Sequence, residues 1–136
     1  MKKVLVVDDT KSILKMVKFV LDDKYDLYLS NSGSLALDIL ERKPIDVVLM
    51  DVEMPEMDGI ETVRKIREME NIKDIPVIFF TGSTSKDTVD KCMELGMVDY
   101  IVKPYKPDDL IDRLEKCFKR SKYIAPKDGN GGNGEL

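Results

Sequence analysis

Polar side chains that could take part in one reaction follow four apolar runs of this 136-residue sequence. Asp8 and Asp9 follow the first run, Asp51 the third, Thr81 the fourth and Lys103 the fifth. If the runs are strands of one parallel sheet, these side chains meet at its carboxyl edge, where ligands collect. Carboxylates this close repel one another, and a hard divalent cation such as Mg²⁺ relieves the repulsion. A neighbouring lysine and hydroxyl could stabilise a transferred phosphoryl group, with Asp51 as the nucleophile that forms an acyl phosphate.

Each of these residues, taken alone, also has an ordinary structural interpretation. Asp8 and Asp9 could cap the helix that begins near residue 10, and Thr81 could cap a later helix. Lys103 could be a solvated loop charge. These alternatives stay open for the single residues, whereas the placement of all of them at one sheet edge favours the chemical interpretation.

The elements that must position these side chains alternate between strand and helix. Five short apolar runs predict strands, near residues 4–7, 25–29, 47–50, 77–80 and 100–102. The segments between and after them have apolar residues at helical spacing, which predicts five helices. Strict alternation predicts an α/β fold, a doubly wound, flavodoxin-like parallel sheet with helices on both faces. The second run alternates like an edge strand and the first, third and fourth are uniformly apolar, which favours the strand order 2-1-3-4-5.

Composition narrows the classes of function. The chain has no histidine, which excludes histidine metal sites and histidine-dependent nucleophilic catalysis. Its net charge of −4 argues against nucleic-acid binding by this chain alone. No apolar run approaches the roughly 20 residues needed to cross a bilayer, so we expect a cytoplasmic protein without membrane contact. Cys92 and Cys117 fit no metal or redox motif, and reduced thiols in apolar helix faces are expected.

The predicted domain spans residues 1–120, and residues 121–136 are predicted to be a flexible tail or linker. The apolar pattern lapses after residue 120, and residues 126–134 consist mainly of glycine, asparagine and other polar residues. Such a segment buries too little apolar surface to offset the entropy of ordering it.

Four motifs give the chain a family resemblance. They are Val-Leu-Val-Val-Asp-Asp at residues 4–9, Val-Leu-Met-Asp-Val-Glu-Met-Pro-Glu-Met-Asp-Gly at residues 48–59, Phe-Phe-Thr-Gly at residues 79–82 and Asp-Tyr-Ile-Val-Lys-Pro at residues 99–104. In this order and at these separations they resemble the receiver domain of two-component response regulators, over residues 2 to about 120. The resemblance to single-domain chemotaxis and phosphorelay regulators leaves open whether the chain stands alone or is part of a longer regulator.

The resemblance implies a phosphorylation site with a metal. Asp51 would be the phosphoacceptor, and Asp8 and Asp9 the acidic pair around Mg²⁺. Asp9, Asp51 and the backbone carbonyl of Glu53 would bind the metal directly, whereas Asp8 would act mainly through water. The side chains of Glu53 and Ser83 stand at two positions that influence how fast the acyl phosphate hydrolyses in this family.

The resemblance also implies a switch. Thr81 would hydrogen-bond the phosphoryl oxygens, Lys103 would form an ion pair with them, and the bond from Lys103 to Pro104 would be cis. Thr81 and Tyr100 would be a coupled pair that changes the surface of the fourth helix, fifth strand and fifth helix, roughly residues 86–95 and 100–119. The phosphodonor would be a sensor histidine kinase or a phosphotransfer protein. An output partner, or a second copy of the domain, would bind the switched surface.

Two other classes of function fit the sequence less well. Phosphatases and phosphotransferases with an aspartyl nucleophile resemble an Asp-x-Asp-x-Thr pattern with a cap over the pocket. Here Glu53 stands two residues after Asp51, and 136 residues leave no room for a cap. A flavodoxin-like electron carrier needs a Ser-, Thr- and Gly-rich phosphate loop after its first strand. The two aspartates at that place would repel a flavin phosphate. We therefore expect a signalling domain whose only catalysis is on itself.

Overall fold

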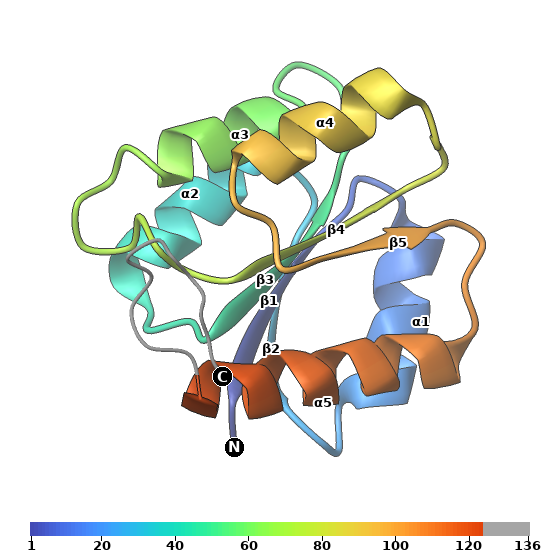
Figure 1. Cartoon of the computed structure of the whole chain (residues 1–136). Helices are drawn as coiled ribbons and strands as arrows, with labels where there is room; N and C mark the ends of the chain where they lie inside the picture. Colours follow the sequence, from blue (N-terminus) through green and yellow to red (C-terminus); the bar gives the residue numbers. More distant parts are fainter. Residues whose placement is uncertain (124–136) are drawn as a thin grey trace. The chain divides into compact units, whose positions relative to one another are not determined.

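A computed structural model describes the backbone of residues 1–123 and the side chains of residues 1–120. Strands and helices alternate along the whole described chain (Figure 1). The strands are β1 (Lys3–Val7), β2 (Asp26–Ser30), β3 (Val47–Asp51), β4 (Val77–Thr81) and β5 (Asp99–Val102). The helices are α1 (Lys11–Leu21), α2 (Gly33–Arg42), α3 (Gly59–Ile66), α4 (Lys86–Glu94) and α5 (Pro107–Tyr123).

The five strands form one parallel sheet in the order β2-β1-β3-β4-β5. Every residue of β3 and β4 is buried, as the uniformly apolar runs predict, whereas β2 and β5 are partly exposed at the two edges. The predicted α/β fold, its five helices and its strand order are confirmed.

Helices cover both faces of the sheet within residues 1–105, which form one compact unit. α2, α3 and α4 lie on one side and α1 lies on the other (Figure 1). Alternate strand residues, such as Leu5, Val48 and Phe79, pack with Ala36 and Val63 in a buried core under α2 and α3. Close packing of this core keeps the sheet rigid. The carboxyl ends of the strands, which carry the candidate side chains, are therefore fixed in position.

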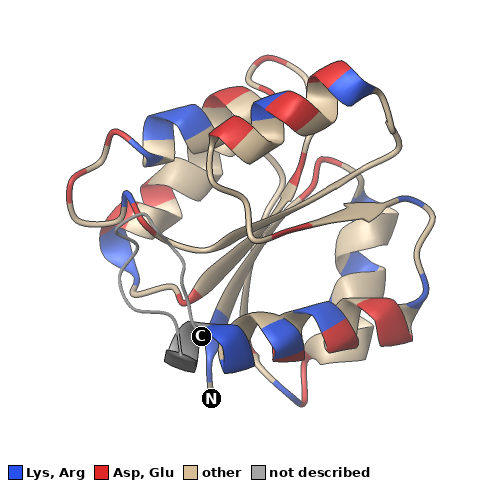
Figure 2. Cartoon of the chain, in the orientation of Figure 1, with Lys and Arg blue, Asp and Glu red and all other residues tan. Residues whose placement is uncertain are grey.

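A side-chain cap stands at the start of α4, and charged residues line the helix. Ser85 caps α4 by accepting a hydrogen bond from the Thr88 N–H. Acidic and basic residues alternate along α4 (Figure 2). Two of them, Asp87 and Lys91, form an ion pair of 3.2 Å one helical turn apart.

Arg67 ties the end of α3 to the start of β4 and to the end of α4. Its Nε donates a hydrogen bond of 2.7 Å to the Leu95 carbonyl, and its Nη1 donates to the carbonyls of Lys73 and Ile75 at 2.9 and 2.7 Å. Burial lowers the pKa of this guanidinium. One charged side chain thus donates to three carbonyls that lie outside the helices and strands.

α5 belongs to a second unit and is described by itself. It begins at Pro107, and Asp108 and Asp109 lie in its first turn, where acidic groups suit the helix dipole. Leu110, Leu114 and Cys117 are its buried side chains. The helix ends at Tyr123, three residues beyond the predicted end of the domain. The rest of the predicted tail lies outside the described residues.

Candidate functional site

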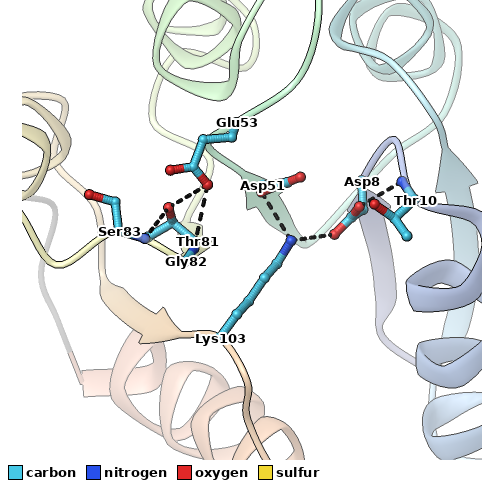
Figure 3. Close-up of polar contacts among 8 residues, drawn as sticks. All are labelled: Asp8, Thr10, Asp51, Glu53, Thr81, Gly82, Ser83 and Lys103. Atoms are coloured by element: carbon cyan, nitrogen blue, oxygen red, sulfur yellow. Dashed lines mark hydrogen bonds and ion pairs between the residues drawn. The ribbon is translucent and has the colours of Figure 1, made fainter.

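The side chains predicted to act together do meet at the carboxyl edge of the sheet (Figure 3). Asp8 follows β1, Asp51 is the last residue of β3, Thr81 is the last residue of β4, and Lys103 follows β5. Asp8, Asp51 and Thr81 are fully buried or nearly so. A buried polar group without a partner is costly, so these three residues must be held by specific contacts.

Three carboxylates form the acidic part of the site. Ligand oxygens of Asp8, Asp9 and Asp51 all lie within 4.8 Å of one another. Asp8 and Asp51 are buried and Asp9 is exposed, so the cluster opens to solvent on the Asp9 side. One oxygen of Asp51, Oδ1, is buried, and the Lys103 ammonium is its charged neighbour. A hard cation with oxygen ligands fits this donor set, since it would compensate the repulsion among the three carboxylates.

Lys103 bridges the two buried carboxylates. Its Nζ lies 3.0 Å from Asp8 Oδ2 and 3.2 Å from Asp51 Oδ1. Burial lowers the pKa of Lys103, but its hydrogen bond to Asp8 and its ion pair with Asp51 outweigh that effect and raise the pKa overall. The ammonium therefore stays charged where negative charge is concentrated.

The pKa of the Asp51 carboxyl group is perturbed by its surroundings. Burial, together with the neighbouring charge of Asp8, raises its pKa to about 6, against the opposing effect of Lys103. Perturbation by burial together with specific charged neighbours is typical of functional sites.

Asp8 is oriented from its other side by the chain that follows it. Its Oδ1 accepts a hydrogen bond of 2.8 Å from the Thr10 N–H. Thr10 is the N-cap of α1 and makes no side-chain capping bond. Asp8 thus fixes the turn into α1 and points its second oxygen at Lys103. It is not the cap of the helix, because Thr10 is the N-cap residue and Asp8 accepts from the Thr10 N–H rather than from an N–H of the first helical turn.

Gly59 allows the chain to pass close behind Asp51. A Cβ at Gly59 would overlap the carbonyl oxygen of Asp51 and lie 2.9 Å from its carbonyl carbon and 3.0 Å from Met50 Cγ. The Gly59 N–H donates a hydrogen bond of 2.8 Å to the carbonyl of Val52, which closes the loop after β3. Asp58 caps α3 by accepting from the Glu61 N–H at 2.8 Å. These contacts fix the backbone that presents the Asp51 side chain.

The loop after β4 is organised around the hydroxyl of Thr81. This hydroxyl donates a hydrogen bond of 2.9 Å to Glu53 Oε1 and accepts one of 3.1 Å from the Ser83 N–H. Glu53 Oε1 also accepts from the Gly82 N–H at 3.4 Å. Only the backbone carbonyl of Glu53 is a predicted ligand, and no pattern in the sequence indicates this contact of its side chain.

Tyr100 is linked to the same loop. It lies beside Phe79 in the register of β4 and β5 and is half-buried. Its hydroxyl donates a hydrogen bond of 2.6 Å to the Ser83 carbonyl. Burial raises the pKa of this phenol. The predicted pair of Thr81 and Tyr100 is therefore connected through the backbone of Ser83.

The bond between Lys103 and Pro104 is cis, as the family resemblance implies. The next residue, Tyr105, stacks on Phe80 with 5.9 Å between ring centroids. Lys103 Nζ lies 5.2 Å from the centroid of the same Phe80 ring. The Lys103 ammonium thus lies over the face of an aromatic ring, at a distance that allows a cation–π interaction.

The fold and this site define a class of protein, a doubly wound α/β domain with an acidic pocket and a lysine at its carboxyl edge. The model of the response regulator receiver domain family matches residues 4–115. The chain therefore belongs to the response regulator receiver domains. A phosphoacceptor role in two-component signalling fits the acidic pocket.

Individual relatives agree with this assignment. The chain is 38% identical over 123 residues to a probable cyclic di-GMP phosphodiesterase of Vibrio cholerae, covering 89% of this chain and 28% of the relative. It is 40% identical over 115 residues to the CAI-1 autoinducer sensor kinase/phosphatase CqsS of the same species, covering 83% of this chain and 17% of the relative. It thus spans less than a third of the length of both.

Among solved structures, the chemotaxis protein CheY4 of Vibrio cholerae superimposes with a TM-score of 0.81 at 34% identity. The match covers 85% of this chain and 98% of CheY4. Within the described part of this chain, no helix is both long and apolar enough to cross a membrane.

Proposed function

We propose that Asp51 accepts a phosphoryl group from the phosphohistidine of a sensor kinase or a phosphotransfer protein. One observation carries this proposal. Asp51 is a buried carboxylate at the end of a central strand, and its Oδ1 lies 3.2 Å from the Lys103 ammonium. An anionic nucleophile needs such a cation nearby, because negative charge accumulates when a second anion approaches.

The transfer forms one bond and breaks one. An Asp51 carboxylate oxygen bonds to phosphorus, the bond from phosphorus to the donor's imidazole nitrogen breaks, and the imidazole leaves with the electron pair and takes up a proton. Lys103 compensates charge on the phosphoryl oxygens. The Thr81 hydroxyl, at the end of β4, and the Gly82 N–H, at the start of the following loop, supply hydrogen-bond donors to the same oxygens.

A Mg²⁺ ion belongs to this site in the proposal. Asp9, Asp51 and the Glu53 carbonyl would hold it directly and Asp8 through water, which suits a cation that keeps several waters. When bound, the ion neutralises charge on the carboxylates and on the phosphoryl oxygens. The close set of three carboxylates supports this assignment.

The output of the domain is a change at the surface formed by α4 and β5, together with α5 by the family resemblance. Thr81 turns toward the phosphoryl group, and the Ser83 N–H then loses its acceptor. The Ser83 carbonyl holds the Tyr100 hydroxyl, so the loop movement releases Tyr100 to a second rotamer. An output partner or a second copy of this domain binds the changed surface.

The chain acts on itself rather than on a separate substrate. Its catalysis consists of taking up and losing its own phosphoryl group, and any further activity would come from other domains. A cytoplasmic location is part of the proposal, because the ATP-using kinase domains that supply the phosphoryl group face the cytoplasm.

Intact-mass spectrometry with acetyl phosphate tests the proposal. The wild-type protein should gain one phosphoryl group with Mg²⁺ and none with EDTA. Asp51→Asn should gain none, whereas Asp38→Asn, which changes an exposed aspartate on α2, should label like the wild type. Labelling of Asp51→Asn at the wild-type rate would contradict the assignment.

NMR spectra with and without beryllofluoride test the switch. We expect shifts for Tyr100 and for the amides of α4, in addition to those of the loops around Asp51. Shifts confined to those loops would show that the change does not reach the proposed surface.

A further inference from the structure

The side chain of Glu53 occupies donors that the phosphoryl group needs. Its Oε1 accepts hydrogen bonds from the Thr81 hydroxyl at 2.9 Å and from the Gly82 N–H at 3.4 Å (Figure 3). Under the proposed function, these two groups donate to the phosphoryl oxygens. Both acceptors are anionic oxygens, so the carboxylate and the phosphoryl group offer the donors the same kind of partner.

The two anions cannot use these donors together. A hydroxyl carries one hydrogen to donate and a backbone amide carries one, so each donor serves one strong acceptor at a time. A second negative charge beside the phosphoryl oxygens also repels them. The Glu53 side chain must therefore leave Thr81 and Gly82 before the phosphoryl group is fully bound.

We infer that the Glu53 carboxylate is an internal competitor of the phosphoryl group, a latch that holds Thr81 in the unphosphorylated position. This inference rests on the proposed function and adds to it a residue that sets how readily the switch closes. Glu53 is a positioning residue, because it acts through Thr81. The latch also stabilises the position of Ser83, since the Thr81 hydroxyl that Glu53 binds accepts a hydrogen bond from the Ser83 N–H.

Two substitutions separate the parts of the latch. Glu53→Ala removes both the acceptor and the charge, whereas Glu53→Gln removes the charge and keeps an acceptor oxygen. Neither alters the backbone carbonyl of residue 53, the atom proposed as a metal ligand. Glu56→Gln is a matched control, because Glu56 is an exposed acid of the same loop and neutralising it changes the net charge equally.

The experiment is a titration with beryllofluoride at saturating Mg²⁺, with the bound fraction read from amide peaks of the loops around Asp51. Glu53→Ala should bind the analogue about three- to tenfold more tightly than the wild type, the range expected from one hydrogen bond. Glu53→Gln should gain less than Glu53→Ala. Glu56→Gln should stay within about twofold of the wild type, because Glu56 is exposed like Glu53 but does not accept the hydrogen bonds from Thr81 and Gly82 that Glu53 accepts.

A second background tests whether the effect runs through Thr81. Thr81→Val removes the donor, so Glu53→Ala should gain less than about twofold when it is added to this variant. A full gain in the Thr81→Val background would overturn the latch in favour of a general charge effect. If the wild type binds beryllofluoride and the Glu53→Ala variant binds it no more tightly, the latch is also overturned, while the proposed function stands. If neither protein binds beryllofluoride, the proposed function fails and the latch fails with it.

Discussion

Replacing Gly59 by alanine should destabilise the domain, although alanine usually stabilises a helix relative to glycine. Gly59 is the first residue of α3, and an added methyl group would overlap the backbone carbonyl of Asp51. That oxygen cannot rotate away as a side chain could, so either the end of β3 or the first turn of α3 must move. Overpacking of this kind costs about 1–3 kcal/mol, and a backbone neighbour places the cost at the upper end.

The gain from removing glycine flexibility in the unfolded chain is about 0.4–1 kcal/mol. The net loss for Gly59→Ala is therefore about 2 kcal/mol, which lowers the Tm of a domain of this size by about 5 to 8 °C. Urea unfolding followed by circular dichroism measures the loss. Gly82→Ala is the matched control, because a Cβ at Gly82 meets no atom within 4 Å. A Gly59→Ala protein as stable as the wild type would refute the close approach of the chain behind Asp51.

Three further predictions concern the rest of the described chain. Arg67→Met should lower the free energy of unfolding in urea by about 2–3 kcal/mol, because three carbonyls lose a charged donor, whereas Arg64→Met on the exposed side of α3 should change it little. A small loss for Arg67→Met would contradict the three hydrogen bonds. The Cys92 thiol, whose pKa burial raises to about 11, should react with Ellman's reagent at pH 8 roughly a hundredfold more slowly than an exposed thiol, measured in a Cys117→Ser background. Rapid reaction of the folded protein would contradict its burial. Mg²⁺ at ten times its Kd should stabilise the protein by about 1.4 kcal/mol in thermal unfolding, and Asp9→Ala should remove most of that gain. An equal gain in the variant would remove Asp9 from the proposed metal site.

The strand order and the meeting of the site residues could be predicted because both follow from pattern. Uniformly apolar runs place β3 and β4 in the middle of the sheet, and the residues directly after parallel strands must share one edge. This pattern alone was enough to predict that four side chains meet at that edge, those of Asp8, Asp51, Thr81 and Lys103.

The contacts that sequence reasoning missed depend on directions that no spacing encodes. The side chain of Glu53 turns toward Thr81 across 28 residues of chain. Gly59 is needed because the backbone of Asp51 passes close to it. The sequence does not reveal this contact, since glycine also occurs at helix starts without such a close approach. Arg67 reaches three carbonyls that lie up to 28 residues away. These contacts are products of the tertiary fold and become visible only once the strands and helices are placed.

Chemical trapping of the modified residue tests the central claim, that Asp51 carries the phosphoryl group, most directly. Borohydride reduces an aspartyl phosphate to homoserine, which is stable through digestion and tandem mass spectrometry. After incubation with acetyl phosphate and Mg²⁺, homoserine should be found at position 51 alone and should be absent from the EDTA control. Homoserine at the position of Asp8 or Asp9, with unmodified Asp51, would contradict the account.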